Sequence, residues 1–184
     1  MKRLIDVLLS VAGLVVLSPL LLFTALAIVL DDGFPVLFGQ ARVGLRGQVF
    51  NMFKFRSMRH DATDPGPYFT RTQDCRVTRV GRIIRRLSVD ELPQLFNVAR
   101  GDMSLVGPRP DLPLQRALYS DADWVQRCSV RPGVTGLSQA TYRSSATPSE
   151  RLALDLRYTR EVSVSLDIKI LWSTIGRLFG KDAN

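Results

Sequence analysis

Two adjacent carboxylates, Asp90 and Glu91, are the residues of this chain best suited to chemistry. They follow two arginines, Arg85 and Arg86, and precede the stretch Leu92–Phe96. A carboxylate can act as a nucleophile, a general base or a metal ligand, and an arginine binds phosphate through a planar fork of donors. The alternative is structural, with one carboxylate capping a helix and the other exposed to solvent.

A short helix is predicted directly after this pair. Apolar residues recur at helical spacing from Leu92 to Ala99, and Gly101 ends the pattern. With Asp90 as the N-cap, Pro93 would occupy the third helical position, where a missing N–H costs nothing. The sequence therefore places both carboxylates at a helix start, where phosphate oxygens are also stabilised.

The composition limits the chemistry that the chain can perform. Its 184 residues are 46% apolar, enough for one domain with a hydrophobic core. Only four of the 25 basic residues are lysines, and this arginine excess favours a phosphate-bearing ligand, an anionic lipid or nucleic acid as partner. The single histidine, His60, excludes a multi-histidine metal site, and Cys75 and Cys128 lack metal-ligand or redox spacing. The chemistry must rest on carboxylates and arginines.

A long apolar segment from Val7 to Leu30 predicts a membrane helix of roughly 24 residues, long enough to cross a bilayer. A cleaved signal peptide is the alternative, but no small-x-small cleavage site precedes Asp31. Ser18-Pro19 interrupts the segment, and a proline there can bend the helix back toward the leaflet that it entered. Basic residues flank both ends, so the residues alone leave a kinked span and a re-entrant helix as alternatives.

Turn residues predict a β-hairpin and two stiff loops that carry arginines. Gly44–Gly47 separates strand-like runs at 36–38 and 49–55. Arg109 lies between two prolines in Gly107–Pro110, so its guanidinium has little entropy to lose on binding. A second loop, 130–139, combines Arg131 with hydroxyl and glycine residues that allow close approach to a phosphate.

Apolar spacing predicts the other helices. Residues 78–87 and 167–181 each predict an amphipathic helix, suited either to the headgroup layer of a membrane or to a core contact. A further helix is expected over 112–128, with Trp124 and Val125 in the core. The fold class is α/β, mainly helical with a short β-hairpin.

Six stretches, spread over nearly the whole chain, carry a family resemblance. They are Ser18-Pro19, Lys54–Met58, Ser88–Gln94, Asn97–Pro110, Arg131–Gly136, and Asp155 with Tyr158. This combination resembles the bacterial sugar transferase family, the monotopic phosphoglycosyl transferases that start glycoconjugate assembly on polyprenol phosphate. The resemblance implies a re-entrant membrane helix, residues 1–31, broken at Ser18-Pro19, and a cytoplasmic catalytic domain, residues 32–184, on the face of the bacterial inner membrane.

The resemblance also implies a reaction and its residues. Asp90 is the expected nucleophile, and Glu91 assists it as a base or a metal ligand. Asp90 attacks the sugar phosphate of a UDP-sugar, UMP leaves, and polyprenol phosphate then attacks the aspartyl phosphosugar. Mg²⁺ is the expected cofactor. It would be bound by Asp90 and Glu91 and would neutralise the negative charge of the diphosphate. Candidates for phosphate and nucleotide contacts are Arg85, Arg109, Arg131 and Arg143, and Asp155 is expected to have a supporting or substrate role.

Two other functions fit parts of the sequence. A membrane-tethered nucleic-acid binder would explain the arginine excess, but the chain lacks an interleaved basic-aromatic platform. A membrane scaffold without activity would leave the carboxylate pair structural. We therefore expect a UDP-sugar donor, a polyprenol phosphate acceptor and membrane phospholipids as partners, and no nucleic acid; a homo-oligomer stays open.

Overall fold

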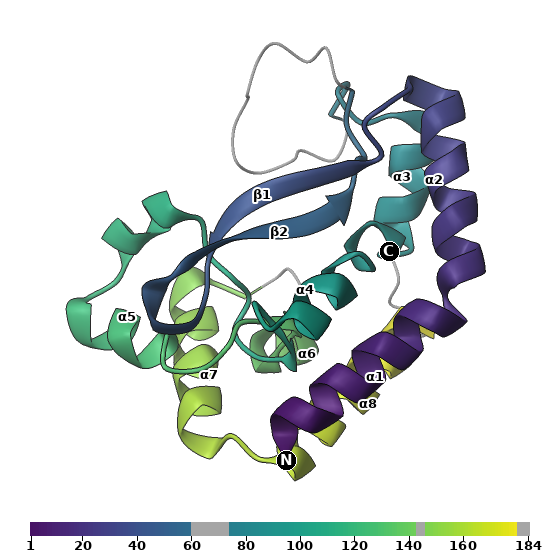
Figure 1. The fold of residues 1–184 in the computed structure, drawn as a ribbon. Coiled ribbons are helices and arrows are strands. Elements are labelled where there is room, and N and C mark those ends of the chain that lie inside the picture. The colour runs from purple at the N-terminus through teal and green to yellow at the C-terminus, as the bar shows by residue number, and fades with distance from the viewer. Residues whose placement is uncertain (60–73, 143–145, 180–184) are drawn as a thin grey trace.

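The computed structural model describes residues 1–59, 74–142 and 146–179 (Figure 1). It confirms a mainly helical chain with a short antiparallel hairpin. The helices are α1 (Lys2–Val16), α2 (Ser18–Asp32), α3 (Arg79–Arg86), α4 (Gln94–Arg100), α5 (Asp121–Arg127), α6 (Leu137–Tyr142), α7 (Pro148–Glu161) and α8 (Val164–Phe179); the strands are β1 (Leu37–Val43), β2 (Val49–Phe55), β3 (Ser104–Val106) and β4 (Gly133–Thr135); short 3-10 turns lie at Leu45–Gly47, Val89–Glu91 and Pro113–Leu118.

Helices α1 and α2 form a pair bent by 60° at Leu17. Pro19 lies in the first turn of α2, where its missing N–H breaks no helical hydrogen bond, and the Ser18 hydroxyl donates to the Val15 carbonyl at 2.7 Å. The break predicted at Ser18-Pro19 is thus confirmed. No single helix in the described parts of the chain has the length and apolar character needed to cross a membrane, and α1 and α2 meet that requirement only together.

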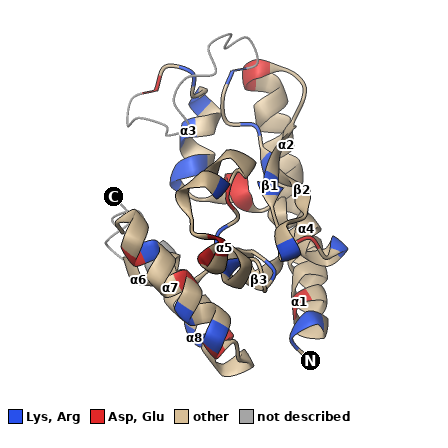
Figure 2. Ribbon diagram, turned by 90° about the vertical axis from the view of Figure 1, so that its left-hand side faces the viewer, with Lys and Arg blue, Asp and Glu red and all other residues tan. Residues whose placement is uncertain are grey.

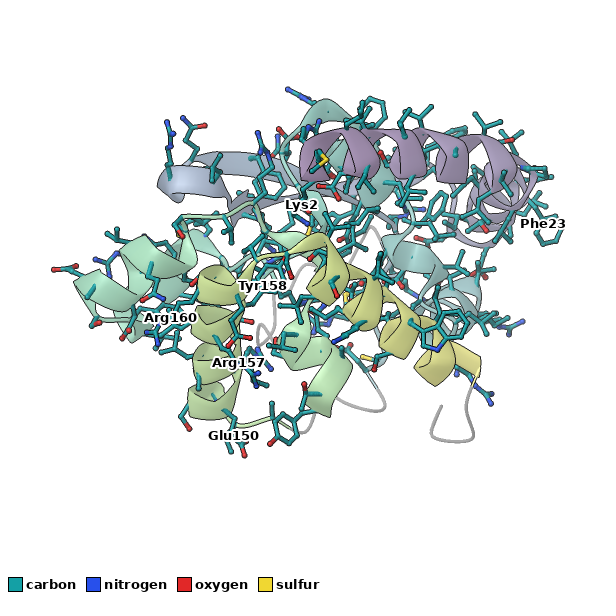
Figure 3. The ribbon with its side chains drawn as sticks, turned by 90° about the horizontal axis from the view of Figure 1, so that it is seen from below. Lys2, Phe23, Glu150, Arg157, Tyr158 and Arg160 are labelled. Atoms are coloured by element: carbon teal, nitrogen blue, oxygen red, sulfur yellow. The ribbon has the colours of Figure 1, made fainter. Side chains whose placement is uncertain are left out.

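The start of α1 is bound to the second half of the chain. Lys2 forms an ion pair with Asp167, in the first turn of α8, and the Tyr158 hydroxyl donates to the same carboxylate at 2.7 Å. Figure 3 shows Lys2 and Tyr158 near each other where α1 approaches the start of α8. One turn further along α1, the buried Asp6 accepts a hydrogen bond from the Ser104 hydroxyl at 2.8 Å. One side of the first turns of α1 therefore packs against the rest of the chain.

The hairpin predicted around Gly44–Gly47 is formed by β1 and β2, and α4 packs against it (Figure 1). Asn97 of α4 accepts a hydrogen bond from the Phe53 amide at 2.9 Å and donates to the Asn51 carbonyl at 2.8 Å. Met52 and Val98 are buried in the same cluster. Because Asn97 satisfies two backbone groups of β2, it fixes how α4 lies along the strand.

Helix α3 confirms the helix predicted at 78–87 and begins at Thr78, whose side chain accepts a hydrogen bond from the Gly81 amide. Ile84 is buried in a cluster with Ile28 of α2. Ile83 and Leu87 are exposed, so only part of the apolar face of α3 packs into the core.

The helix predicted over 112–128 is interrupted. A 3-10 turn at Pro113–Leu118 ends at Tyr119, and α5 begins after Ser120, whose side chain accepts a hydrogen bond from the Asp123 amide. The core position predicted for Val125 is wrong, because that side chain is 69% exposed. Trp124 is half-buried and packs against Tyr119, with the rings 5.5 Å apart. Ser120 competes for backbone hydrogen bonds as an N-cap, and this local signal outweighs the apolar spacing.

Candidate active site

The two carboxylates occupy a 3-10 turn between α3 and α4, not the start of α4. The prediction that Asp90 caps the central helix is therefore wrong, because α4 begins after Pro93. Ser88 enters the turn in a left-handed conformation with φ of 56°, and the Glu91 and Leu92 amides bond to carbonyls three residues back. Those amides are consequently not free to bind an anion.

Glu91 is held by two cations from separate elements. Its Oε1 accepts from Lys54 Nζ of β2 at 2.7 Å and from Arg109 Nη2 at 2.8 Å. Burial raises the pKa of Glu91, but the charges of Arg109 and Lys54 together outweigh burial and lower the pKa to about 2. Glu91 raises the pKa of Arg109 in turn. The two cations and Glu91 form a charged cluster, in which the Glu91 carboxylate stays ionised at physiological pH.

Asp90 has a different environment, although it is the neighbouring residue. Its side chain is buried, with 8% of the residue exposed, and no ion pair within the described residues includes it. Burial raises the pKa of Asp90, the charge of Glu91 raises it further, and Lys54 and Arg85 oppose both effects. Two adjacent carboxylates with opposite pKa shifts are typical of an active site, where each has its own role.

Arg109 is positioned from behind by Arg127. The Arg127 Nη2 donates to the Arg109 carbonyl at 2.6 Å, and its guanidinium pairs with Asp111 and, at 3.0 Å, with Asp155. Asp155 also accepts from the Ser138 hydroxyl at 3.0 Å. These charged side chains of Arg127, Asp111 and Asp155 are all buried. Asp155 therefore contacts the arginine loop through Arg127, from the core.

The two stiff loops predicted to carry arginines lie against each other. A Cβ on Gly133 would lie 2.1 Å from the Gly107 amide nitrogen, so only glycine allows the backbones to approach this closely. The arginine of the second loop, Arg131, binds the protein backbone: its Nε donates to the Gly101 carbonyl at the end of α4 at 2.9 Å. Of the predicted arginines, Arg85 and Arg109 lie near the carboxylates, Arg131 caps α4, and Arg143 lies outside the described residues, as does His60.

The carboxylate pair fits a magnesium ion shared with a substrate. No group of three or more metal-ligating side chains occurs among residues 1–59, 74–142 and 146–179. Magnesium in phosphate-transfer sites is commonly bound by one or two carboxylates together with substrate phosphates, and does not require a complete protein cage. The ion pairs of Glu91 engage Oε1 alone, and Asp90 makes no ion pair in the described structure. Both residues therefore have carboxylate oxygens suited to such an ion.

Sequence reasoning missed Arg127 and Asp111, which hold the loop of Arg109. Asp111 directly follows Pro110, and its position after the arginine loop was an available signal. The sequence around Arg127 contained no such signal, because Arg127 is one basic residue at the end of a predicted helix and its partner Asp155 is 28 residues away.

Comparison with known proteins identifies the family. A family model described as bacterial sugar transferase matches residues 1–181. Undecaprenyl-phosphate glucose phosphotransferase of Komagataeibacter xylinus is 49% identical over 99% of this chain and 36% of its own length. A UDP-N-acetylgalactosamine-undecaprenyl-phosphate N-acetylgalactosaminephosphotransferase of Aeromonas hydrophila is 41% identical, over 95% of this chain and 42% of its own length. The exopolysaccharide production protein PSS of Rhizobium leguminosarum bv. phaseoli is 43% identical, over 95% of this chain and 93% of its own length.

This chain thus spans less than half the length of two of these relatives and nearly all of the third. The similarity covers the hairpin, the carboxylate turn and both stiff loops, since the family model includes all of them. The chain belongs to the bacterial sugar transferase family.

Proposed function

We propose that this chain transfers a sugar-1-phosphate from a UDP-sugar to polyprenol (undecaprenyl) phosphate and releases UMP, an initiating step of glycoconjugate biosynthesis. Two of the relatives are named for undecaprenyl phosphate, and one of these also for a UDP-sugar. The observation that carries the proposal is the buried Asp90 beside Glu91, whose carboxylate is bound by Lys54 and Arg109. This arrangement combines a candidate nucleophile with cations that bind phosphate.

In the first half-reaction, an Asp90 carboxylate oxygen attacks the β-phosphorus of the UDP-sugar. A bond forms between that oxygen and phosphorus, the bond from phosphorus to the bridging oxygen breaks, and UMP leaves with the bridging oxygen. Burial of Asp90 supports this role, because water is kept from the carboxylate and from the intermediate. Arg109 and Lys54 supply donors for the phosphate oxygens.

In the second half-reaction, a phosphate oxygen of polyprenol phosphate attacks the phosphorus of the aspartyl phosphosugar. The bond between Asp90 and phosphorus breaks, and the free carboxylate is restored. The acceptor is already an anion near neutral pH and needs no strong base. With a pKa of about 2, Glu91 is a weak base, and we assign it to orienting Lys54 and Arg109. Magnesium, held by Asp90 and Glu91, would neutralise the diphosphate charge.

We also propose that α1 and α2 enter one leaflet of the bacterial inner membrane and return, which leaves residues 32–184 on the cytoplasmic face. The charged residues of the helix pair lie only near its two ends (Figure 2), and Phe23 lies at the outer edge of the molecule (Figure 3). Val16, Leu22, Phe23 and Leu30 are 71–79% exposed. An apolar surface of this extent is stable against lipid, not water.

Helix α8 supports contact with phospholipids as well. Ile168, Trp172 and Ile175 are exposed, while Ile170 is buried in the core. Within the side chains that the structure describes, the apolar face predicted at 167–181 is thus mostly exposed, as an interfacial helix requires. Tryptophan is typical of the headgroup boundary. Cysteine labelling tests the topology: a cysteine introduced at Lys2 should react only from the cytoplasmic side, and labelling from the periplasm alone would reject a re-entrant pair.

A UMP-release screen tests the reaction. The purified full chain is incubated with magnesium, polyprenol phosphate and a panel of UDP-sugars. We expect UMP from at least one donor, loss of that activity in Asp90→Asn, and retention in Glu161→Gln, an exposed carboxylate of α7. Wild-type protein that releases no UMP from any donor, or an Asp90→Asn variant with full activity, would reject the proposed function.

A further inference from the structure

Arg42 lies on the face of the hairpin that meets the carboxylate turn. In the pairing of β1 with β2, Phe38 is opposite Lys54 and Arg42 is opposite Phe50. Side chains of paired residues, and of residues two apart on a strand, lie on the same face of a sheet. Arg42 therefore shares a face with Lys54, which binds Glu91.

Hydrogen bonds place Arg42 beside the arginine loop. Its Nη1 donates to the Pro110 carbonyl at 3.0 Å, one residue after Arg109, and its Nη2 donates to Gln40 Oε1 at 2.6 Å. The neighbouring Val43 amide donates to the Asp111 carbonyl at 2.9 Å, so β1 and the loop run together here. The guanidinium is thus fixed by two neutral acceptors, close to Arg109.

The charge of Arg42 has no direct counterion in the part of the chain that the structure describes. None of the ion pairs among these residues includes Arg42, and its buried Nε has no hydrogen-bond acceptor. A buried donor without an acceptor is unfavourable, and a guanidinium has five donors to satisfy. The conformation therefore leaves Arg42 with donors to offer to an anion.

Two other cations bind Glu91, on the same side of the site as Arg42. Glu91 is already shared by Lys54 and Arg109, and the Asp111 carboxylate pairs with Arg127. Burial and the charge of Arg109 lower the pKa of Arg42, and the charges of Asp111 and Glu91 offset this lowering only in part. Lys54 and Arg109 thus share the single charge of Glu91, and Arg42 adds a cation that forms no ion pair in the described part of the chain. An anion with several oxygens would relieve the repulsion between the two arginines.

We propose that Arg42 and Arg109 together bind a phosphate group of the substrates. This inference rests on the proposed function and adds a binding residue to it. Two sources share this chemistry, namely the phosphate that leaves in UMP and the phosphate of the incoming polyprenol phosphate. The departing UMP and the incoming polyprenol phosphate are each bonded, in their own half-reaction, to the phosphorus of the sugar phosphate on the side opposite Asp90. One subsite can therefore bind first the phosphate of UMP and then that of polyprenol phosphate.

The test compares Arg42→Gln and Arg42→Lys with Arg46→Gln, which removes a charge from the exposed turn of the same hairpin. UMP affinity is measured by calorimetry on the full chain in lipid nanodiscs, and KM is measured for the UDP-sugar and for polyprenol phosphate. Arg42→Gln should weaken UMP binding by about tenfold to 100-fold, the range for a lost charged hydrogen bond. Arg42→Lys should recover part of the affinity, and Arg46→Gln should match the wild type.

The two kinetic constants separate the sources of the phosphate. A higher KM for both substrates indicates a subsite used twice, and a higher KM for the UDP-sugar alone limits Arg42 to the nucleotide. If the UMP affinity of Arg42→Gln is within twofold of the wild-type value, the inference is overturned, even if the kcat of the variant is lower. If Arg42→Gln does not fold, Arg42→Lys decides by the same measurement. Active wild-type enzyme with unchanged variants rejects only this inference, whereas inactive wild-type enzyme rejects the proposed function.

Discussion

Arg127 donates a hydrogen bond to the main-chain carbonyl of Arg109 at 2.6 Å, across 18 residues of sequence. The contact fixes the backbone of the residue whose side chain reaches Glu91. Asp111 and Asp155 neutralise Arg127 in the core. The position of Arg109 is thus set by a buried charge network, and the conformation of its own proline-rich loop is only part of the cause.

Arg127→Leu should destabilise the protein strongly. The substitution leaves the buried carboxylates of Asp111 and Asp155 without their cation, which costs about 3–5 kcal/mol. Denaturant unfolding of the full chain in detergent measures the loss. Arg157→Leu, which removes an exposed arginine of α7, is the matched control and should change stability by less than about 0.5 kcal/mol. Equal stability of the two variants would show that the network contributes nothing.

Arg109→Ala should lower the catalytic efficiency while leaving the fold intact. A lost charged hydrogen bond to a substrate phosphate costs about 1.5–3 kcal/mol, which is about tenfold to 150-fold in kcat/KM. The side chain is more than one-third exposed, so its removal leaves no cavity in the core. Arg100→Ala, a more exposed arginine at the end of α4, controls for the loss of charge. Unchanged kcat/KM in a folded Arg109→Ala variant would remove this residue from the site.

Glu91 should stabilise the folded protein in a pH-dependent way. Its pKa falls from 4.5 to about 2 on folding, so the stabilisation is complete above pH 4.5 and is lost as the pH falls toward 2. Glu91→Gln should therefore be less stable than the wild type at pH 7, by about 1–3 kcal/mol, and the difference should shrink below pH 4.5. Unfolding curves at pH 7, 4 and 3 provide the measurement. A difference that does not change with pH would contradict the ion pairs.

Asp90→Asn should abolish UMP release and yet raise stability. Burial raises the pKa of Asp90, so its ionised form destabilises the folded state at neutral pH, and removing that charge should add about 0.5–2 kcal/mol. The gain should shrink as the pH falls through the pKa of Asp90, because the wild-type carboxyl then binds a proton.

Intact mass spectrometry checks the chemistry of the same residue. Wild-type enzyme with the UDP-sugar alone should release about one UMP per site and carry a phosphosugar adduct on Asp90. An adduct mapped to Glu91 would reassign the nucleophile, and a first UMP that requires polyprenol phosphate would indicate direct transfer.

Local signals in the sequence predicted local structure well. Ser18-Pro19 bends the first helix pair, because proline restricts its own backbone. The glycines at 44 and 47 flank the hairpin turn and Gly101 ends α4 at a positive φ, because glycine tolerates backbone conformations that other residues avoid. The prediction of an N-cap at Asp90 was wrong, because hydrogen bonds between residues three apart form a separate turn before Pro93. That competition is not visible in apolar spacing.

The contacts between distant residues could not be predicted in this way. Lys54 meets Glu91 across 37 residues, and Arg127 meets Asp155 across 28. Neither pair has a spacing that a single helix or strand would impose. The family resemblance supplied the roles expected of Asp90 and Glu91, whereas only the structure supplied their opposite environments.

The ion pair between Lys2 and Asp167 has a consequence for truncation. Removing residues 1–31 would take Lys2 away from the mostly buried Asp167 carboxylate, which also accepts a hydrogen bond from Tyr158. The same deletion would remove Asp6, which accepts a hydrogen bond from Ser104 of β3. The shortened chain would expose the apolar surface that α2 covers at Ile28 as well. The segment that we propose to enter the membrane is therefore also packed, on one side, against the rest of the chain, and its deletion would not yield a detergent-free enzyme.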